Sequence, residues 1–340
     1  MTKQQSAILK GVAILMMLWY HLFQRDDMSQ LCISLITIDE VPLAHIISRA
    51  CYPVTFFMIL SGYGLSYLYQ QGKLHAKDQL RRLLRLYIHY WVILLIFVSI
   101  GVFVNPNRYI IDPLHLAANI TGLHCTYNGE TWFLLPYAIN CLLAVWYMPT
   151  LFRIHTWRQA LPLLIGYALC FGGMKIFMMK YGDALDNTTI KIFIFQIVYL
   201  ITNFFYFALG VLLFRLYQHY GETTFARKNI WIVAAGLLIL IAVKSCFKVT
   251  LLDGVYAFLF ILLFLHLPLH NCISNALTKL GQHSMPMWMT HTFFAVYLFQ
   301  DFIYSFRYPL LIFVALVTIC YLVSFPVLWI SKRIIKLCRI

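Results

Sequence analysis

Apolar segments of about 20 residues recur along the whole chain. A membrane-spanning helix needs roughly 20 mostly apolar residues. Ten such segments are present, at approximately 7–24, 50–70, 87–104, 131–150, 160–179, 192–214, 230–247, 254–270, 284–304 and 309–331. The chain is 62% hydrophobic and only 11% charged, whereas soluble domains carry about 25% charged residues. We therefore expect an all-α integral membrane protein with about ten transmembrane helices.

The first apolar segment begins near Lys3 and Lys10, as the apolar part of a signal peptide would. It continues through Trp19 to Phe23, however, without a small-residue cleavage site. We therefore expect this segment to be retained as the first membrane span.

The basic residues are distributed unequally between the two sides of the membrane. With ten spans, both termini lie on one side, which then holds 17 basic and 2 acidic residues of the net +14 chain. The other side holds 9 basic and 10 acidic residues. Cytoplasmic loops carry the excess of Lys and Arg, so we expect both termini to be cytoplasmic. Too little of the chain faces water for a nucleic-acid surface, and we expect no nucleic-acid partner.

The connections between the apolar segments are short, and the longest, at about 25–49 and 105–130, lie on the outer side. We therefore expect a single transmembrane domain over 1–340 with no separate soluble domain. The nine cysteines are isolated, with no CxxC pair and no Cys/His cluster at metal-binding spacing. We expect them to pack as small apolar residues, and we expect no metal site.

Lys10 and His21 are separated by ten residues in the first apolar segment. Eleven helical steps return the chain to nearly the same face about 16 Å further along the axis. An ionisable residue inside the membrane is costly and often functional, and a neutral imidazole there would suit a general base. The alternative is a packed histidine with Lys10 extending to the headgroups. Spacing alone does not choose between them.

A basic run, 79–85, leads into the third apolar segment. Arg82 and Arg85 lie three residues apart on one helical face and could grip a phosphorylated ligand. Contact with anionic lipid is the more ordinary explanation.

Small residues also interrupt an aromatic span, at Ser61, Gly62 and Gly64. Close helix packing is the usual reason for such residues, and passage of a slender substrate arm is the alternative.

Other candidate residues lie near the outer side. Glu130 and Trp132 open the fourth span, and His291 is a second imidazole within an apolar segment. Trp132 alone would be ordinary for a membrane interface, and His291 could serve packing or function. P-loop, HExxH and GxSxG motifs are absent from the sequence.

In this order, these features resemble the membrane acyltransferase 3 family. The matching stretches are Lys10-x10-His21, Phe57 to Gly62, Arg82-x-x-Arg85, Trp132-Phe133-Leu134, and Leu280-Gly281 to His291. The resemblance covers essentially the whole chain, including the number of spans. One departure is Lys10, where the family more often has Arg, which removes the bidentate fork but keeps the charge.

The resemblance implies a multi-pass enzyme of the bacterial inner (plasma) membrane. It implies transfer of an acyl group other than aminoacyl, usually acetyl from cytoplasmic acetyl-CoA, to a hydroxyl of a surface or lipid-linked glycan. It also implies that His21 is catalytic, and that Lys10, Arg82 and Arg85 bind the donor. Some relatives carry an extra extracytoplasmic hydrolase-like domain, which we do not expect here, so transfer would be direct or would use a separate partner protein.

We therefore expect an acyl-CoA:glycan O-acyltransferase, with acyl-CoA as a substrate and no permanently bound cofactor. His21 would deprotonate the acceptor hydroxyl or carry the acyl group transiently. Candidates for acceptor handling or for lining a pore are Ser61, Glu130, Trp132 and His291. A transporter or flippase for an acylated or glycan-linked substrate is one alternative, although no inverted repeat is evident. A structural or sensory membrane subunit is another.

Overall fold

The computed structural model describes residues 1–154, 157–181, 189–225, 230–247 and 250–340. Helices dominate them: α1 (Lys3–Phe23), α2 (Met28–Leu31), α3 (Leu43–Ser48), α4 (Pro53–Gln70), α5 (Ala76–Val104), α6 (Pro113–Thr121), α7 (Leu134–Phe152), α8 (Trp157–Tyr181), α9 (Thr189–Phe225), α10 (Ile230–Cys246), α11 (Asp253–Phe264), α12 (Asn271–Gln282), α13 (Ser284–Thr292), α14 (Gln300–Tyr304) and α15 (Pro309–Leu337). Short helical turns are η1 (Gly129–Thr131), η3 (Thr250–Leu252) and η4 (Phe293–Tyr297). Strands β1 (Thr37–Ile38) and β2 (Val41–Pro42) form a small antiparallel ribbon.

Among the described residues, seven helices are long and apolar enough to cross a membrane. They cover Lys3–Phe23, Leu43–Gln70, Ala76–Val104, Gly129–Phe152, Arg158–Tyr181, Ile190–Gln218 and Pro309–Leu337. Two shorter apolar helices, α10 and α11, match the expected seventh and eighth spans. The all-α membrane class is therefore confirmed, whereas the count of ten and the cytoplasmic termini stay predictions. Some residues of the charge comparison lie outside the described residues: Asp183, Asp186, Arg227, Lys228 and Lys248.

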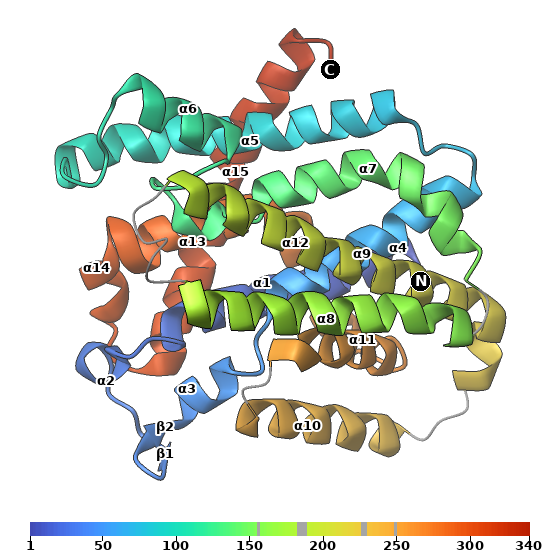
Figure 1. The fold of residues 1–340 in the computed structure, drawn as a ribbon. Coiled ribbons are helices and arrows are strands. Elements are labelled where there is room, and N and C mark those ends of the chain that lie inside the picture. The colour runs from blue at the N-terminus through green and yellow to red at the C-terminus, as the bar shows by residue number, and fades with distance from the viewer. Residues whose placement is uncertain (155–156, 182–188, 226–229, 248–249) are drawn as a thin grey trace.

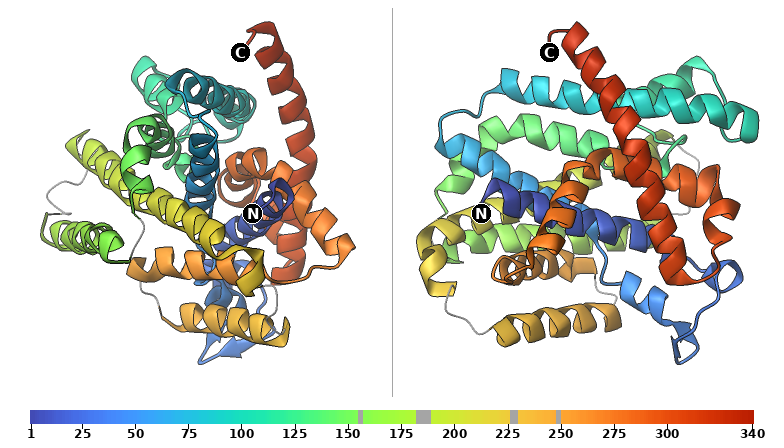
Figure 2. Two further views of the ribbon diagram at one scale, coloured as in Figure 1. Left: turned by 90° about the vertical axis from the view of Figure 1, so that its right-hand side faces the viewer. Right: turned by 180° about the vertical axis from the view of Figure 1, so that it is seen from behind.

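The long helices lie side by side, with α9 in contact with α4, α7 and α8. They run across Figure 1, whereas α15 crosses them steeply, as the rear view in Figure 2 shows. Helix α1 contacts α4, α12, α13 and α15 and so lies inside the bundle. Helix α8 lies at the edge (Figure 2), and none of its spanning window is buried within the protein.

Glycines set the closest helix contacts. Gly11 of α1 and Gly281 of α12 each face backbone of the other helix so closely that a Cβ would collide with a carbonyl. Gly62 of α4 and Gly210 of α9 do the same for their pair. Gly64, in contrast, has open space around its Cβ position. Gly62 therefore serves close helix packing, the more ordinary of the two sequence interpretations.

The expected ninth span, 284–304, is not one continuous helix. It consists of α13, the π-helical turn η4 and the short α14. Tertiary contacts stabilise the interruption of this helix. Phe293 of η4 stacks on Phe97 of α5 with 4.5 Å between ring centroids. The Tyr297 hydroxyl accepts a hydrogen bond from the backbone N–H of Gly129 at 3.2 Å. An apolar run cannot reveal such contacts, and π-turns often occur at functional sites.

Candidate functional site

Three ionisable side chains from distant parts of the sequence meet at the C-terminal end of α1. The Nε2 atom of His21 lies 3.5 Å from Oε2 of Glu130. The rings of His21 and His291 have centroids 4.9 Å apart. The His21 side chain is 15% exposed, whereas His291 is fully buried. The structure thus joins three residues that the sequence analysis named separately.

Hydrogen bonds from two other segments fix the end of α1 that carries His21. The last carbonyls of a helix have no partner within the helix. Here His45 Nδ1 bonds the carbonyl of Phe23 at 2.8 Å. The Tyr304 hydroxyl donates to the carbonyl of Leu22 at 2.8 Å. His21 therefore lies on a turn whose position is set by α3 and α14.

Glu130 lies in the short turn η1, which is tied to the broken helix. The indole N–H of Trp288 donates to the carbonyl of Glu130 at 3.1 Å. A Cβ on Gly129 would stand 2.9 Å from the Tyr297 hydroxyl, so only glycine fits at this position without displacement. The carboxylate is thereby held beside His21 by contacts from α13 and η4.

Asn128 adds a second tie between the same segments, and the sequence analysis did not identify it. Its Nδ2 donates to the carbonyl of Met289 at 2.8 Å, and its Oδ1 accepts from the Thr292 hydroxyl at 2.8 Å. Both carbonyl and hydroxyl flank His291 in the chain. One asparagine in the segment between α6 and η1 gives no signal of this bridging role in the sequence.

The protonation of His291 follows from its hydrogen bond. Its Nδ1 lies 2.6 Å from the carbonyl of Trp288, and because a carbonyl only accepts, Nδ1 carries the proton. The other ring nitrogen, Nε2, is buried and has no hydrogen-bond partner in the part of the chain that the structure describes. His291 therefore presents an unused acceptor beside His21.

His21 and Glu130 lie on the wall of a cavity of about 850 Å³. Its volume is typical of small-molecule sites, which span about 300–1,000 Å³. Trp132 lies on the same wall and packs on Tyr199 with 4.2 Å between ring centroids. The other lining residues come mainly from α1, α4, α8 and α9: Met17, Tyr20, Cys51, Tyr52, Pro53, Val54, Thr55, Ala168, Phe171, Gly172, Met174, Lys175, Phe195, Thr202, Asn203, Tyr206, Leu251 and Asp253.

A buried ion pair also borders this cavity. Lys244 Nζ of α10 lies 2.6 Å from Asp253 Oδ1 at the start of α11, and their side chains are 7% and 1% exposed. No sequence pattern marks this pair, because the two residues are nine positions apart on separate apolar segments. Buried charges within apolar helices are costly and are therefore often functional.

The predicted donor-binding residues lie toward the other end of α1. The helix is unbroken between Lys10 and His21, which confirms the predicted helix and places the two residues about 16 Å apart along its axis. Arg82 is close enough to Lys10 to interact with it electrostatically. Arg82 is also within electrostatic range of Tyr137, whose side chain lies beside Ser61. Lys10, Arg82 and Ser61 are thus brought into one region.

Arg85 is directed elsewhere. Its Nη2 donates to the backbone carbonyl of Ile340 at 3.1 Å, and the side chain is exposed. Of the two arginines in the motif, Arg82 is therefore the one that joins Lys10.

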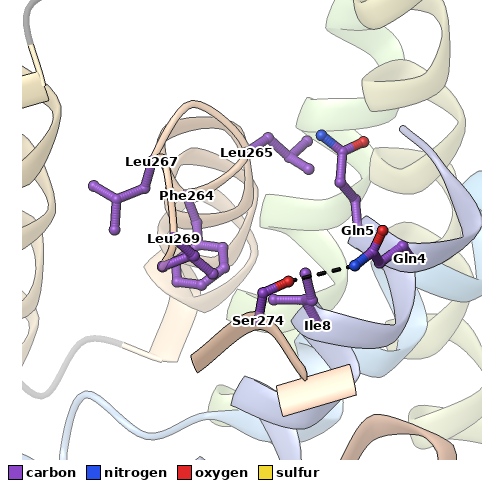
Figure 3. Close-up of a pocket in the computed structure, with 8 residues that line it drawn as sticks. All are labelled: Gln4, Gln5, Ile8, Phe264, Leu265, Leu267, Leu269 and Ser274. Atoms are coloured by element: carbon purple, nitrogen blue, oxygen red, sulfur yellow. Dashed lines mark hydrogen bonds between the residues drawn. The ribbon is translucent and has the colours of Figure 1, made fainter. Parts of the chain in front are cut away.

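A smaller cavity of about 210 Å³ lies between the start of α1 and the end of α11. Figure 3 shows Gln4 and Ser274 joined by a hydrogen bond of 3.4 Å across one side, with apolar side chains on the other. Its lining residues carry no charge: Gln4, Gln5, Ile8, Phe264, Leu265, Leu267, Leu269 and Ser274. It therefore offers no cation to a phosphorylated ligand.

Among the residues that the structure describes, no group of three or more His, Cys, Asp or Glu side chains is placed to hold a metal ion.

One comparison with known proteins identifies the family of this chain. A family model described as "Acyltransferase domain" matches residues 7–329. No curated protein and no solved structure matches the chain. The match extends from the first turns of α1 into α15 and includes every residue of the site. The chain is therefore a member of the acyltransferase 3 family, as the sequence resemblance indicated.

Proposed function

We propose that this multi-pass membrane protein is an O-acyltransferase that moves an acyl group, most simply acetyl, from cytoplasmic acyl-CoA to a glycan hydroxyl. The glycan is a surface or lipid-linked saccharide, and the membrane is the bacterial inner membrane. The observation that carries the proposal is the His21–Glu130 pair on the wall of the large cavity. Membership of an acyltransferase family supports it.

His21 is proposed to act as the general base. It takes the proton of the acceptor hydroxyl as the oxygen attacks the thioester carbonyl. The carbon–sulfur bond then breaks, and the protonated imidazole returns the proton to the leaving CoA thiolate. Glu130, 3.5 Å from Nε2, stabilises the imidazolium that exists between these two proton transfers. A general base becomes a protonated imidazolium during the reaction, and a carboxylate beside the ring stabilises that charged form. We therefore propose direct transfer rather than an acyl-histidine intermediate.

The donor is proposed to enter from the end of α1 that carries Lys10. Lys10 and Arg82 are close enough to interact electrostatically. Two neighbouring cations can bind the phosphates of CoA. The extended pantetheine arm would then follow α1 toward His21, which places the thioester at the cavity.

The acceptor is proposed to occupy the large cavity. Trp132 and Tyr199 offer aromatic faces there, and apolar faces of sugar rings stack on such surfaces. His291 is not one of the residues that line the cavity, but its ring lies beside that of His21, and its unused Nε2 is proposed to accept a hydrogen bond from a group bound next to His21. Acceptor and thioester would thus meet at His21 from opposite directions.

The proposal is tested with purified protein, radiolabelled acetyl-CoA and the glycan fraction of the parent organism's membranes. Wild type is compared with His21→Ala and with His124→Ala, which replaces an exposed histidine outside the cavity. We expect label in the glycan with wild type and His124→Ala, and a loss of about 10²–10⁴-fold with His21→Ala.

Unchanged transfer by His21→Ala would remove this residue from the mechanism. The transporter alternative would be supported instead if the protein neither binds nor consumes acetyl-CoA and moves an unmodified glycan across the membrane of vesicles that contain it.

A further inference from the structure

Three residues on the wall of the large cavity carry buried polar side-chain atoms that lack hydrogen-bond partners among the described residues: Thr55, Asn203 and Asp253. Nδ2 of Asn203, from α9, is an unpaired donor, and Oδ2 of Asp253, from α11, is an unpaired acceptor. Asn203 and Asp253 are each 1% exposed. Buried polar groups in folded proteins are nearly always paired, so an unpaired donor and an unpaired acceptor in one cavity indicate a missing ligand.

The two residues line the same cavity, and Tyr206 relates their positions. Asn203 and Tyr206 are three positions apart on α9 and so share a helix face. Tyr206 lies within electrostatic reach of Asp253. The other carboxylate oxygen of Asp253 is occupied by Lys244, 2.6 Å away, which fixes the carboxylate and leaves Oδ2 for a ligand.

We propose that Asn203 and Asp253 form a subsite that binds ring hydroxyls of the saccharide acceptor. A hydroxyl both donates and accepts hydrogen bonds, so the ring hydroxyls of one saccharide can donate to Asp253 Oδ2 and accept from Asn203 Nδ2. An acyl chain would leave both atoms unsatisfied. A phosphate would satisfy Asn203 but would be repelled by the carboxylate.

The position of the subsite relative to His21 makes it suitable for orienting the acceptor. Tyr20 is within electrostatic reach of both Glu130 and Asp253, and its ring packs against Tyr52 with 5.9 Å between centroids. Tyr20 itself lines the cavity and precedes His21 in α1, so it relates the subsite to the catalytic histidine. Hydroxyls held at Asp253 would leave another hydroxyl of the same saccharide directed at His21. This assignment rests on the proposed acyltransferase function.

The test uses Asn203→Leu in the full-length protein, because this change removes an unpaired donor at nearly constant volume. Three quantities are measured: the affinity for acetyl-CoA, the melting temperature, and label transfer to the parent organism's membrane glycan at increasing glycan concentration. We expect the apparent KM for the glycan to rise at least tenfold. Acetyl-CoA affinity should be unchanged, and the melting temperature unchanged or higher.

Asn140→Leu is the matched control. Asn140 is equally buried, but its Nδ2 already bonds the carbonyls of Pro136 and Leu200 at 3.0 and 2.9 Å, and it does not line the cavity. We expect this variant to lower the melting temperature and to leave the KM for the glycan within about twofold of wild type.

A second variant, Asp253→Asn, should also raise the KM for the glycan, although its effect on folding is larger because Lys244 loses its counter-ion. An unchanged KM for the glycan with Asn203→Leu would overturn the subsite, and so would a parallel fall in acetyl-CoA affinity or melting temperature.

His21→Ala in the same assay separates the two proposals. If His21→Ala abolishes transfer while Asn203→Leu has no effect, only the subsite is wrong; if His21→Ala transfers normally, the proposed function fails.

Discussion

The two ends of α1 are built differently. At the C-terminal end, His21 and Glu130 lie on segments tied together by hydrogen bonds from α3, α13 and α14. At the N-terminal end, Lys10 is joined by Arg82, a long exposed side chain on another helix. The first end is positioned before any ligand binds, which favours catalysis. At the second end, the exposed Arg82 donates a hydrogen bond to Gln79 of its own helix at 3.2 Å. Two nearby cations of this kind suit a ligand that is bound and released.

Of the changes considered at the two ends of α1, loss of the Glu130 charge should lower the rate of acetyl transfer most. Glu130→Gln keeps the size of the side chain but no longer stabilises an imidazolium at His21. We expect kcat for acetyl transfer to fall by about 10²-fold, with acetyl-CoA affinity unchanged. Steady-state kinetics with labelled acetyl-CoA measure both. Glu40→Gln, which replaces an exposed glutamate in the turn between β1 and β2, is the control. An equal fall in kcat with this variant would show that the effect is not specific to Glu130.

Displacement of η1 should have the next largest effect. A methyl group at position 129 would press on the Tyr297 hydroxyl, so Gly129→Ala should move Glu130 away from His21. We expect a fall in kcat of about tenfold, because misplacing a catalytic group weakens its contribution. The double variant Gly129→Ala/Tyr297→Phe removes the clashing oxygen together with the hydrogen bond that this oxygen accepts from Gly129, and it should recover part of the rate. Tyr297→Phe alone measures the loss of that bond. If the double variant is slower than Gly129→Ala, the clash is not the cause.

Arg82→Ala should affect binding of the donor rather than chemistry. Loss of one charge-assisted contact to a phosphate should raise KM for acetyl-CoA about tenfold, with kcat nearly unchanged. A higher salt concentration should raise the KM of the wild type for acetyl-CoA toward that of the variant, because salt screens the charge interaction. Arg81→Ala serves as the control, because Arg81 is exposed and pairs loosely with Asp78 at 3.9 Å. A change in kcat alone would place Arg82 in the catalytic step instead.

Arg85→Ala should have the smallest effect of the series. Arg85 contacts the carbonyl of Ile340 rather than the Lys10 region, and exposed contacts of this kind contribute little. We expect KM for acetyl-CoA to change by less than about twofold. Titration of both arginine variants with acetyl-CoA compares them directly, and equal losses would show that the motif binds the donor as a pair.

Much of this arrangement could be predicted from the sequence. Apolar length gave the membrane class, and the spacing from Lys10 to His21 placed both on one unbroken helix. Gly62 was correctly associated with close packing. These features are local, because helix periodicity and segment length depend only on residues that are close together in the sequence.

The convergence of the site could not be predicted, because it depends on long-range contacts. Glu130 reaches His21 only through η1 and its ties to Trp288 and Tyr297. These ties exist because the segment 284–304 breaks at a π-turn, where the sequence shows only an apolar run. The Lys244–Asp253 pair was missed for the same reason, since its partners belong to different segments.

The central claim is that His21 and Glu130 act as one catalytic unit, and a double-mutant cycle tests it most directly. Single-turnover acetyl transfer is measured for wild type, His21→Ala, Glu130→Gln and the double variant. If Glu130 acts only through the imidazole, replacing it in the His21→Ala background should change the residual rate by less than about twofold, because effects within one unit are not additive. A further loss of about 10²-fold in the double variant, equal to that of Glu130→Gln alone, would show independent roles and contradict the account.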